Sequence, residues 1–133
     1  MGKFYGFIRY WLPPIIWMAL IFYLSSRLRA SATGKFLFDF LIFKTLHIIE
    51  YAILYFLLFR AFHSINNKQL TIDNKLMLPI FLSIFYSISD EVHQTFVPTR
   101  EGKIRDILID ILGILLMYIY IKNNIKVVKK FLK

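Results

Sequence analysis

Four long apolar runs, separated by short polar segments, restrict what this chain can fold into. They cover approximately residues 5–25, 40–60, 76–95 and 104–122. A bilayer core about 30 Å thick is crossed by about 20 helical residues, so each run is close to the length of one membrane-spanning helix. Hydrophobic residues make up 58% of the 133 positions, more than a soluble domain of this size can cover with polar groups. The sequence therefore predicts an all-α fold, in which residues 1–133 form a single integral membrane bundle of four transmembrane helices with short loops.

The basic residues lie mainly at the ends of these apolar runs. The formal net charge of +9 is by itself compatible with nucleic acid binding. Lys and Arg beside apolar runs are instead typical of membrane proteins, where they contact lipid headgroups, as we expect for the lysine-rich tail. We therefore predict membrane lipids as partners and no nucleic acid. The absence of cysteine excludes disulfides and thiolate metal sites.

The distribution of Lys and Arg also predicts an orientation. Ten of them lie on the side of both termini and the polar connection 66–74, and six lie on the opposite side. The ten are Lys3, Arg9, Arg60, Lys68, Lys75 and the five tail lysines, and the six are Arg27, Arg29, Lys35, Arg100, Lys103 and Arg105. Because the more basic side faces the cytoplasm, we predict a multi-pass protein of the cell membrane with both termini cytoplasmic and the 90–110 segment facing outward.

Polar side chains repeat at helical spacing within three of the runs. The stripes are Lys44, His47 and Tyr51 with Glu50 beside them, then Ser83, Ser87, Asp90 and Gln94, and then Asp106, Asp110 and Gly113. Residues three or four apart share one face of a helix, and Gly113 permits close helix approach. Under the predicted topology all three stripes lie in the outer half of the bundle, so we expect them to meet.

Some of these charges also have a purely structural explanation. Asp90, Glu91 and Asp106 lie near predicted helix ends, where a carboxylate is inexpensive. A charge at a helix centre costs about 2.5–3.5 kcal/mol on insertion scales, so the deeper residues favour a functional role. The deeper residues are Lys44, His47, Glu50 and Asp110. Structural ion pairs are the alternative, formed by Lys44 with Glu50 and by Asp110 with Arg105.

Metal and nucleophile chemistry receive little support from the spacing. His47 and Glu50 lie three positions apart and offer a metal pair, but Glu91 and His93 lie two apart and point to different sides of a helix. No serine occupies a nucleophile-like turn. We therefore predict no metal and no cofactor, and a zinc site or an enzyme that uses a divalent metal is the less favoured alternative.

Anion binding and acid–base chemistry fit the residue types better. The forked donors of Arg100 and Arg105 suit a phosphate or a carboxylate. Asp90, Glu91 and Asp110 are suited to polar or acid–base roles on a headgroup or sugar.

The motifs together resemble the VanZ-like family of small bacterial membrane proteins, which is named for a teicoplanin-resistance factor. The matching residues are Lys44-x-x-His47-x-x-Glu50-Tyr51, Asp90-Glu91-x-x-Gln94-x-Phe96-Val97-Pro98-x-Arg100 and Asp106-x-x-x-Asp110-x-x-Gly113. Two positions depart from the pattern: the frequent Gly before the arginine is Thr99 here, and the frequent Asn of the last motif is Asp110. The resemblance implies a four-helix protein of the cell envelope, with glycopeptide resistance in the best-known member.

Three functional hypotheses follow from these residues. The leading one is a VanZ-like envelope protein with an outward-facing polar pocket that recognises a lipid-linked cell-wall precursor, a lipid headgroup or a glycopeptide. The alternatives are an intramembrane enzyme acting on a lipid-linked substrate, and an assembly protein whose charges only hold the helices together. The predicted pocket residues are Lys44, His47, Glu50, Tyr51, Asp90, Glu91, Gln94, Pro98, Arg100, Arg105, Asp106 and Asp110.

Overall fold

The computed structural model describes residues 2–28 and 31–132, and the helices in these ranges are α-helices. They are α1 (Gly2–Ser25), α2 (Phe36–Ser64), α3 (Ile72–Gln94), α4 (Ile104–Asn123) and the short α5 (Ile125–Phe131). Arg29 and Lys133, which enter the orientation count above, lie outside the described residues. The prediction of an all-α fold is confirmed, and the described residues contain no strand.

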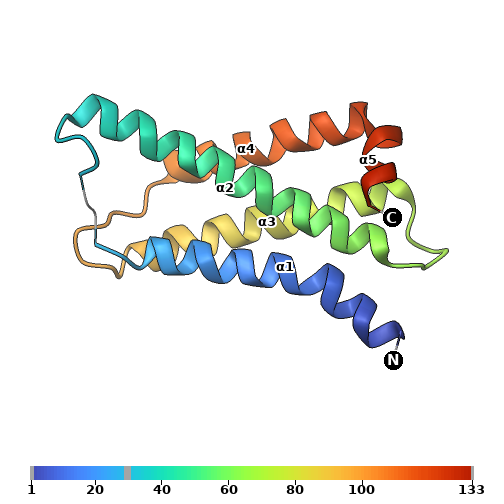
Figure 1. Cartoon of the computed structure of the whole chain (residues 1–133). Coiled ribbons are helices and arrows are strands. Elements are labelled where there is room, and N and C mark those ends of the chain that lie inside the picture. Colours follow the sequence, from blue (N-terminus) through green and yellow to red (C-terminus); the bar gives the residue numbers. More distant parts are fainter. Residues whose placement is uncertain (1, 29–30, 133) are drawn as a thin grey trace.

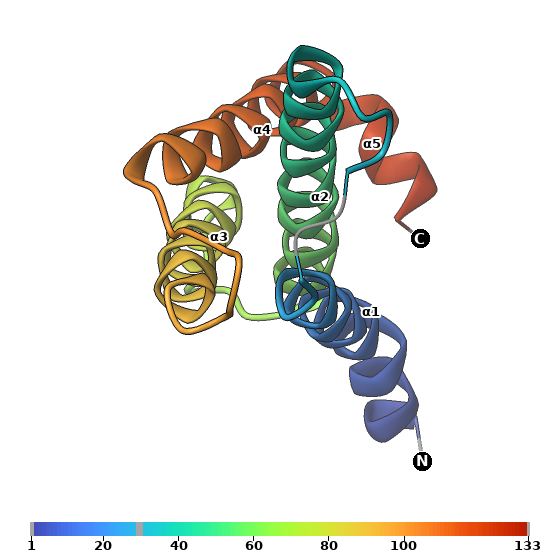
Figure 2. The ribbon, with the colours of Figure 1, turned by 90° about the vertical axis from the view of Figure 1, so that its left-hand side faces the viewer.

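Helix α2 is the centre of the arrangement, because it packs against α1, α3 and α4 (Figures 1 and 2). Helix α3 also packs on α4, while α1 lies along one side of α2 and is joined to it by the Trp17 indole, which donates to the Glu50 carbonyl oxygen at 2.9 Å. Both termini and the 65–71 connection lie at one end of the molecule, and the 26–35 and 95–103 connections lie at the other (Figure 1).

The apolar core occupies the end of the bundle near the termini. On α2 it is formed by Tyr51, Leu54, Tyr55, Leu58 and Phe59, all at most 2% exposed. These positions follow the i, i+3, i+4, i+7, i+8 spacing of one helical face. The same core includes Leu76 and Ile80 of α3 and Ile114 and Ile121 of α4, together with Ile21, Val128 and Leu132.

Helices α2 and α4 approach each other closely at Gly113. A Cβ atom at this position would collide with the carbonyl oxygen of Ile48. A helix interior normally disfavours glycine, so its presence here follows from the close approach that the sequence predicted.

Several helix ends differ from the predicted ones. Helix α2 is longer at both ends, and the carboxylate of Asp39 is favourable in its first turn. Helix α3 starts within the predicted polar connection, where the Thr71 hydroxyl accepts from the Asn74 backbone N–H as an N-cap. The tail was expected as a basic extension, but part of it forms α5, which buries Val128.

Two helices, α1 and α2, are long and apolar enough to cross a membrane by length and composition. Helices α3 and α4 are less apolar and do not meet the same criteria of length and composition. The prediction of four transmembrane helices is therefore not confirmed. Within the most apolar stretches of α1 and α2, only 11% and 22% of residues are buried inside the protein. Most of their apolar side chains therefore face outward.

Candidate functional site

The bundle interior changes from apolar to polar halfway along its length. Following α3 from its start, the inward face carries Leu76 and Ile80, then Ser83 and Ser87, then Asp90. The inward faces of α2 and α4 make the same change. The predicted polar stripes therefore meet inside the described bundle, at the end that holds the 26–35 and 95–103 connections (Figure 1).

An ion pair joins α2 to α4 at the rim of this polar half. The Lys44 ammonium lies 2.5 Å from an Asp106 carboxylate oxygen, and the Arg105 Nε lies 3.6 Å from the same atom. The alternative pairs expected from sequence, Lys44 with Glu50 and Asp110 with Arg105, do not form. Members of those pairs are six and five positions apart, so they point to different sides of their helices.

A second connection runs through all three inner helices. His47 Nδ1 of α2 lies 3.0 Å from an Asp110 oxygen of α4, and the Ser87 hydroxyl of α3 donates to the other Asp110 oxygen at 2.7 Å. Asp110 is fully buried. Asp110 thus places an ionisable carboxylate beside a histidine.

Neutral donors hold the carboxylates at the end of α3. Asp90 accepts from the Ser25 hydroxyl at 2.6 Å and from the Gln94 amide at 3.0 Å. Glu91 accepts from the Lys103 backbone N–H at 2.9 Å. Both acids are at least 95% buried, and neither makes an ion pair with any described residue.

Arg100 has a role that sequence reasoning missed. Its Nε donates to the Arg27 carbonyl oxygen at 2.9 Å, and its Nη2 donates to the Leu24 carbonyl oxygen at 3.2 Å. Arg100 therefore satisfies backbone carbonyls at the end of α1, in addition to lining the pockets described next. Guanidinium has five N–H donors, so these bonds leave capacity for an anion.

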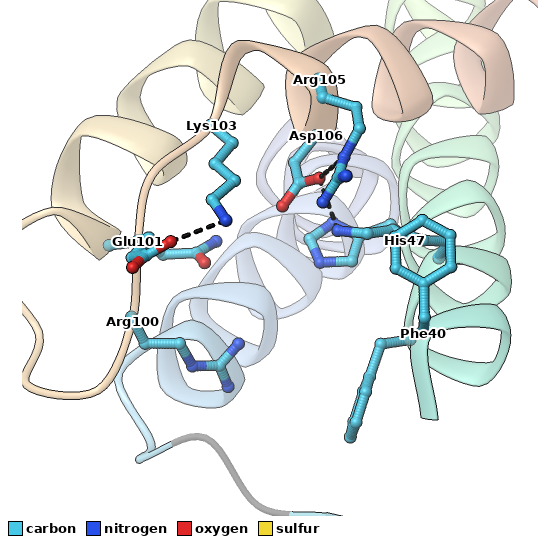
Figure 3. Close-up of a pocket in the computed structure, with 10 residues that line it drawn as sticks. Phe40, His47, Arg100, Glu101, Lys103, Arg105 and Asp106 are labelled. Carbon is cyan, nitrogen blue, oxygen red and sulfur yellow. Dashed lines mark hydrogen bonds and ion pairs between the residues drawn. The ribbon is translucent and has the colours of Figure 1, made fainter. Parts of the chain in front are cut away.

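Two pockets open between these residues. The first, here called the basic pocket, lies between α2, the 95–103 connection and the start of α4, and measures about 70 Å³. Figure 3 shows Arg105, Asp106 and His47 on one side of it and Arg100, Glu101 and Lys103 on the other. The second, the α1 pocket, measures about 280 Å³ and lies between α1, α2 and α3. Both pockets share Phe43, His47, Gln94 and Arg100.

Eight of the twelve predicted residues line these pockets. They are Lys44, His47, Glu50, Asp90, Gln94, Arg100, Arg105 and Asp106. Tyr51, Glu91 and Asp110 lie behind the walls as buried residues, and Pro98 lies on the exposed part of the 95–103 connection. The structure adds Ser25, Arg27, Phe43 and Lys103, among others. The signal for Ser25 and Arg27 was weak, because a serine and an arginine at a helix end are ordinary capping or interfacial residues.

Among the carboxylates that line the pockets, that of Glu50 is the exception to the pairing described above. It lines the α1 pocket and makes neither a hydrogen bond nor an ion pair with any of the described residues. His93 does not line either pocket, and its ring stacks on Phe22 with the ring centroids 4.3 Å apart.

The fold and site define a class of helical protein with an apolar outer surface and a charged cavity at one end of the bundle. The model of the VanZ/LLP1 family matches residues 10–127, and the chain belongs to this family. Neither the curated proteins nor the solved structures include a significant match. The resemblance drawn from the motifs is therefore confirmed across nearly the whole chain.

Proposed function

We propose that this VanZ-family protein is an integral membrane protein of the cell envelope that recognises the phosphate-bearing headgroup of a lipid or of a lipid-linked cell-wall precursor. The observation that carries the proposal is the Glu50 carboxylate, which lines the α1 pocket without a hydrogen bond or ion pair from any described residue. A carboxylate kept in the middle of an apolar helix is costly. A ligand that donates hydrogen bonds to it accounts for its presence.

The outer surface supports a membrane location. Large apolar side chains are exposed on each of the four long helices, among them Phe7, Ile42, Phe85 and Leu108. Soluble monomers seldom expose contiguous apolar surface of this extent. Lipid chains would cover it, with both termini on the cytoplasmic side and the two pockets on the outer side.

The charges around the pockets match a ligand with two different ends. The basic pocket is lined by Lys44, Arg100, Lys103 and Arg105 against the acids Glu101 and Asp106. This excess of positive charge favours a phosphate. The α1 pocket presents the carboxylates Glu50 and Asp90, which favour hydroxyl or ammonium donors. A headgroup in which a phosphate is joined to a sugar or an amine offers both ends.

The same arrangement weighs against a purely structural role, because charges that only hold helices together pair completely. Glu50 pairs with no residue of the described ranges, and the pockets are open. An enzyme acting on the same headgroup would use the same cavity, and product formation on a lipid-linked substrate would distinguish it from a binding protein.

Native mass spectrometry of protein extracted in a mild detergent tests the proposal. We expect a bound lipid in the wild type, and at least a severalfold lower occupancy in Glu50→Gln and Arg105→Gln. Matched controls remove the same charges at the opposite end of α3 and α4: Asp73→Asn and Lys122→Gln should retain the lipid. Equal occupancy in all four variants would overturn the assignment of the pockets.

A link to glycopeptide resistance belongs to the same proposal. If the protein acts on the precursor that glycopeptides bind, its expression should raise the teicoplanin tolerance of a sensitive host, and Glu50→Gln should remove the gain. Unchanged tolerance on wild-type expression would separate this protein from the resistance role, without bearing on lipid binding.

A further inference from the structure

A cluster of potential metal ligands lies behind the pocket wall. His47 of α2, Glu91 of α3 and Asp110 of α4 each place one ligand atom within 4.8 Å of the other two. Glu91 and Asp110 are buried, and His47 is partly buried. Three different helices converge at this point, which is why spacing along the sequence does not reveal the group.

The charges of this cluster are not balanced by cations. Lys44 and Arg105 are engaged with Asp106. The His47 ring lies 3.0 Å from an Asp110 oxygen and carries a positive charge only when it is protonated. Glu91 has only neutral donors around it, the backbone N–H of Lys103 and the amide of Gln94. Buried charges are expensive unless they are paired or coordinate a metal.

An unpartnered hydroxyl provides an independent observation. The side chain of Tyr51 is fully buried, and its hydroxyl has no hydrogen bond within the described chain. Asp90, Asp110, Tyr86 and Glu91 all lie within electrostatic range of this hydroxyl. A buried hydroxyl without a partner costs about 1–3 kcal/mol, and a water bound to a cation at the cluster would accept its hydrogen bond.

We infer that His47, Glu91 and Asp110 form a binding site for one divalent metal ion that joins α2, α3 and α4. The site has one imidazole nitrogen and two carboxylates, a donor set that suits Zn²⁺ or Mn²⁺ better than Mg²⁺ or Ca²⁺, which prefer oxygen alone. Two ionised carboxylates with neutral histidine balance the charge of a divalent ion. The Ser87 hydroxyl donates a hydrogen bond to Asp110 and would orient this carboxylate as a metal ligand.

The site also connects to the pockets through His47. This residue lines both the basic pocket and the α1 pocket, so a bound ion would lie at their common wall. The inference does not depend on the headgroup proposal, because metal binding is measured without any lipid ligand.

Metal content and thermal stability of the full-length protein test the inference. Protein purified in detergent without chelators should contain about one transition metal ion per chain by elemental analysis. After chelation, ZnCl₂ or MnCl₂ should raise the unfolding temperature, since a ligand that binds only the folded state stabilises it, and MgCl₂ should raise it less. A wild type without metal, whose unfolding temperature responds to none of these salts, would overturn the site.

Ligand variants and matched controls make the test specific. His47→Gln and Glu91→Gln should bind Zn²⁺ at least about tenfold more weakly, since even partners of ligands commonly cost 10- to 100-fold. His93→Gln and Glu101→Gln remove the same residue types outside the cluster and should bind as the wild type does. If a ligand variant fails to fold, Asp110→Asn provides the second test, since the amide keeps the size of the side chain and removes its charge. Affinity unchanged in Asp110→Asn, or lowered equally in His93→Gln, would contradict the site.

Discussion

The Nε of Arg100 donates a hydrogen bond to the carbonyl oxygen of Arg27 at 2.9 Å, across 73 positions of sequence. This bond, together with the one to Leu24, connects the 95–103 connection to the end of α1. Carbonyls at a helix C-terminus lack partners within the helix, and a cation there also interacts favourably with the helix dipole.

Arg100→Ala should therefore loosen the end of α1. We expect a loss of about 1 kcal/mol in the free energy of unfolding and faster trypsin cleavage after Arg27. Limited proteolysis in detergent measures the cleavage, with Arg105→Ala as a control that removes a neighbouring cation without contacts to α1. Equal cleavage rates in wild type and Arg100→Ala would contradict the anchoring role.

Thr99 has a φ of 65°, a left-handed conformation that strains a β-branched residue. Glycine has no Cβ, so Thr99→Gly should raise the free energy of unfolding by about 1 kcal/mol. Thr99→Ala retains the Cβ and should bring no comparable gain. Thermal unfolding of both variants in the same detergent checks this, and a Thr99→Gly protein less stable than the wild type would show that the strain is not relieved.

Helical periodicity predicted the inward faces of the helices well. Ser83, Ser87 and Asp90 lie on one buried face because residues that recur at a period of 3.6 point the same way whatever surrounds the helix. The same reasoning correctly placed Gly113 at a close helix contact. These features depend on local geometry, which the sequence determines directly.

Partners on different helices were predicted less well. Lys44 pairs with Asp106 rather than with Glu50, because periodicity gives the face of a helix but not its axial position against a neighbour. Ser25 and Arg27 were missed for the same reason, since they enter the site only when α1 docks. Helix α5 was missed because the lysines of the tail obscure its short apolar face.

The pair of Lys44 and Asp106 should be important for stability, because its side chains are only 17% and 10% exposed. Lys44→Met leaves Asp106 with only the longer contact to Arg105, so the loss of the buried pair should cost up to about 3 kcal/mol. Lys44→Met combined with Asp106→Leu should recover much of that loss. Lys103 and Glu101, 45% and 69% exposed, are the matched surface pair, for which Lys103→Met should cost less than about 1 kcal/mol.

Chemical unfolding of the wild type, Lys44→Met, Asp106→Leu and the double variant gives the coupling free energy of the pair. If the double variant loses the sum of the two single losses, the two side chains act independently and the ion pair does not stabilise the bundle.

The proposed orientation predicts which end of the bundle a reagent outside the cell can reach. The chain contains no cysteine, so a single introduced thiol reports one position. Lys130→Cys lies in α5 near the termini, and Glu101→Cys lies in the 95–103 connection at the opposite end (Figure 1). With both termini cytoplasmic, an impermeant maleimide added to intact cells should label Glu101→Cys and should label Lys130→Cys only after lysis. The reversed pattern would invert the topology and direct both pockets to the cytoplasm, whereas labelling of both thiols in intact cells would mean that the bundle does not separate its two ends across a membrane.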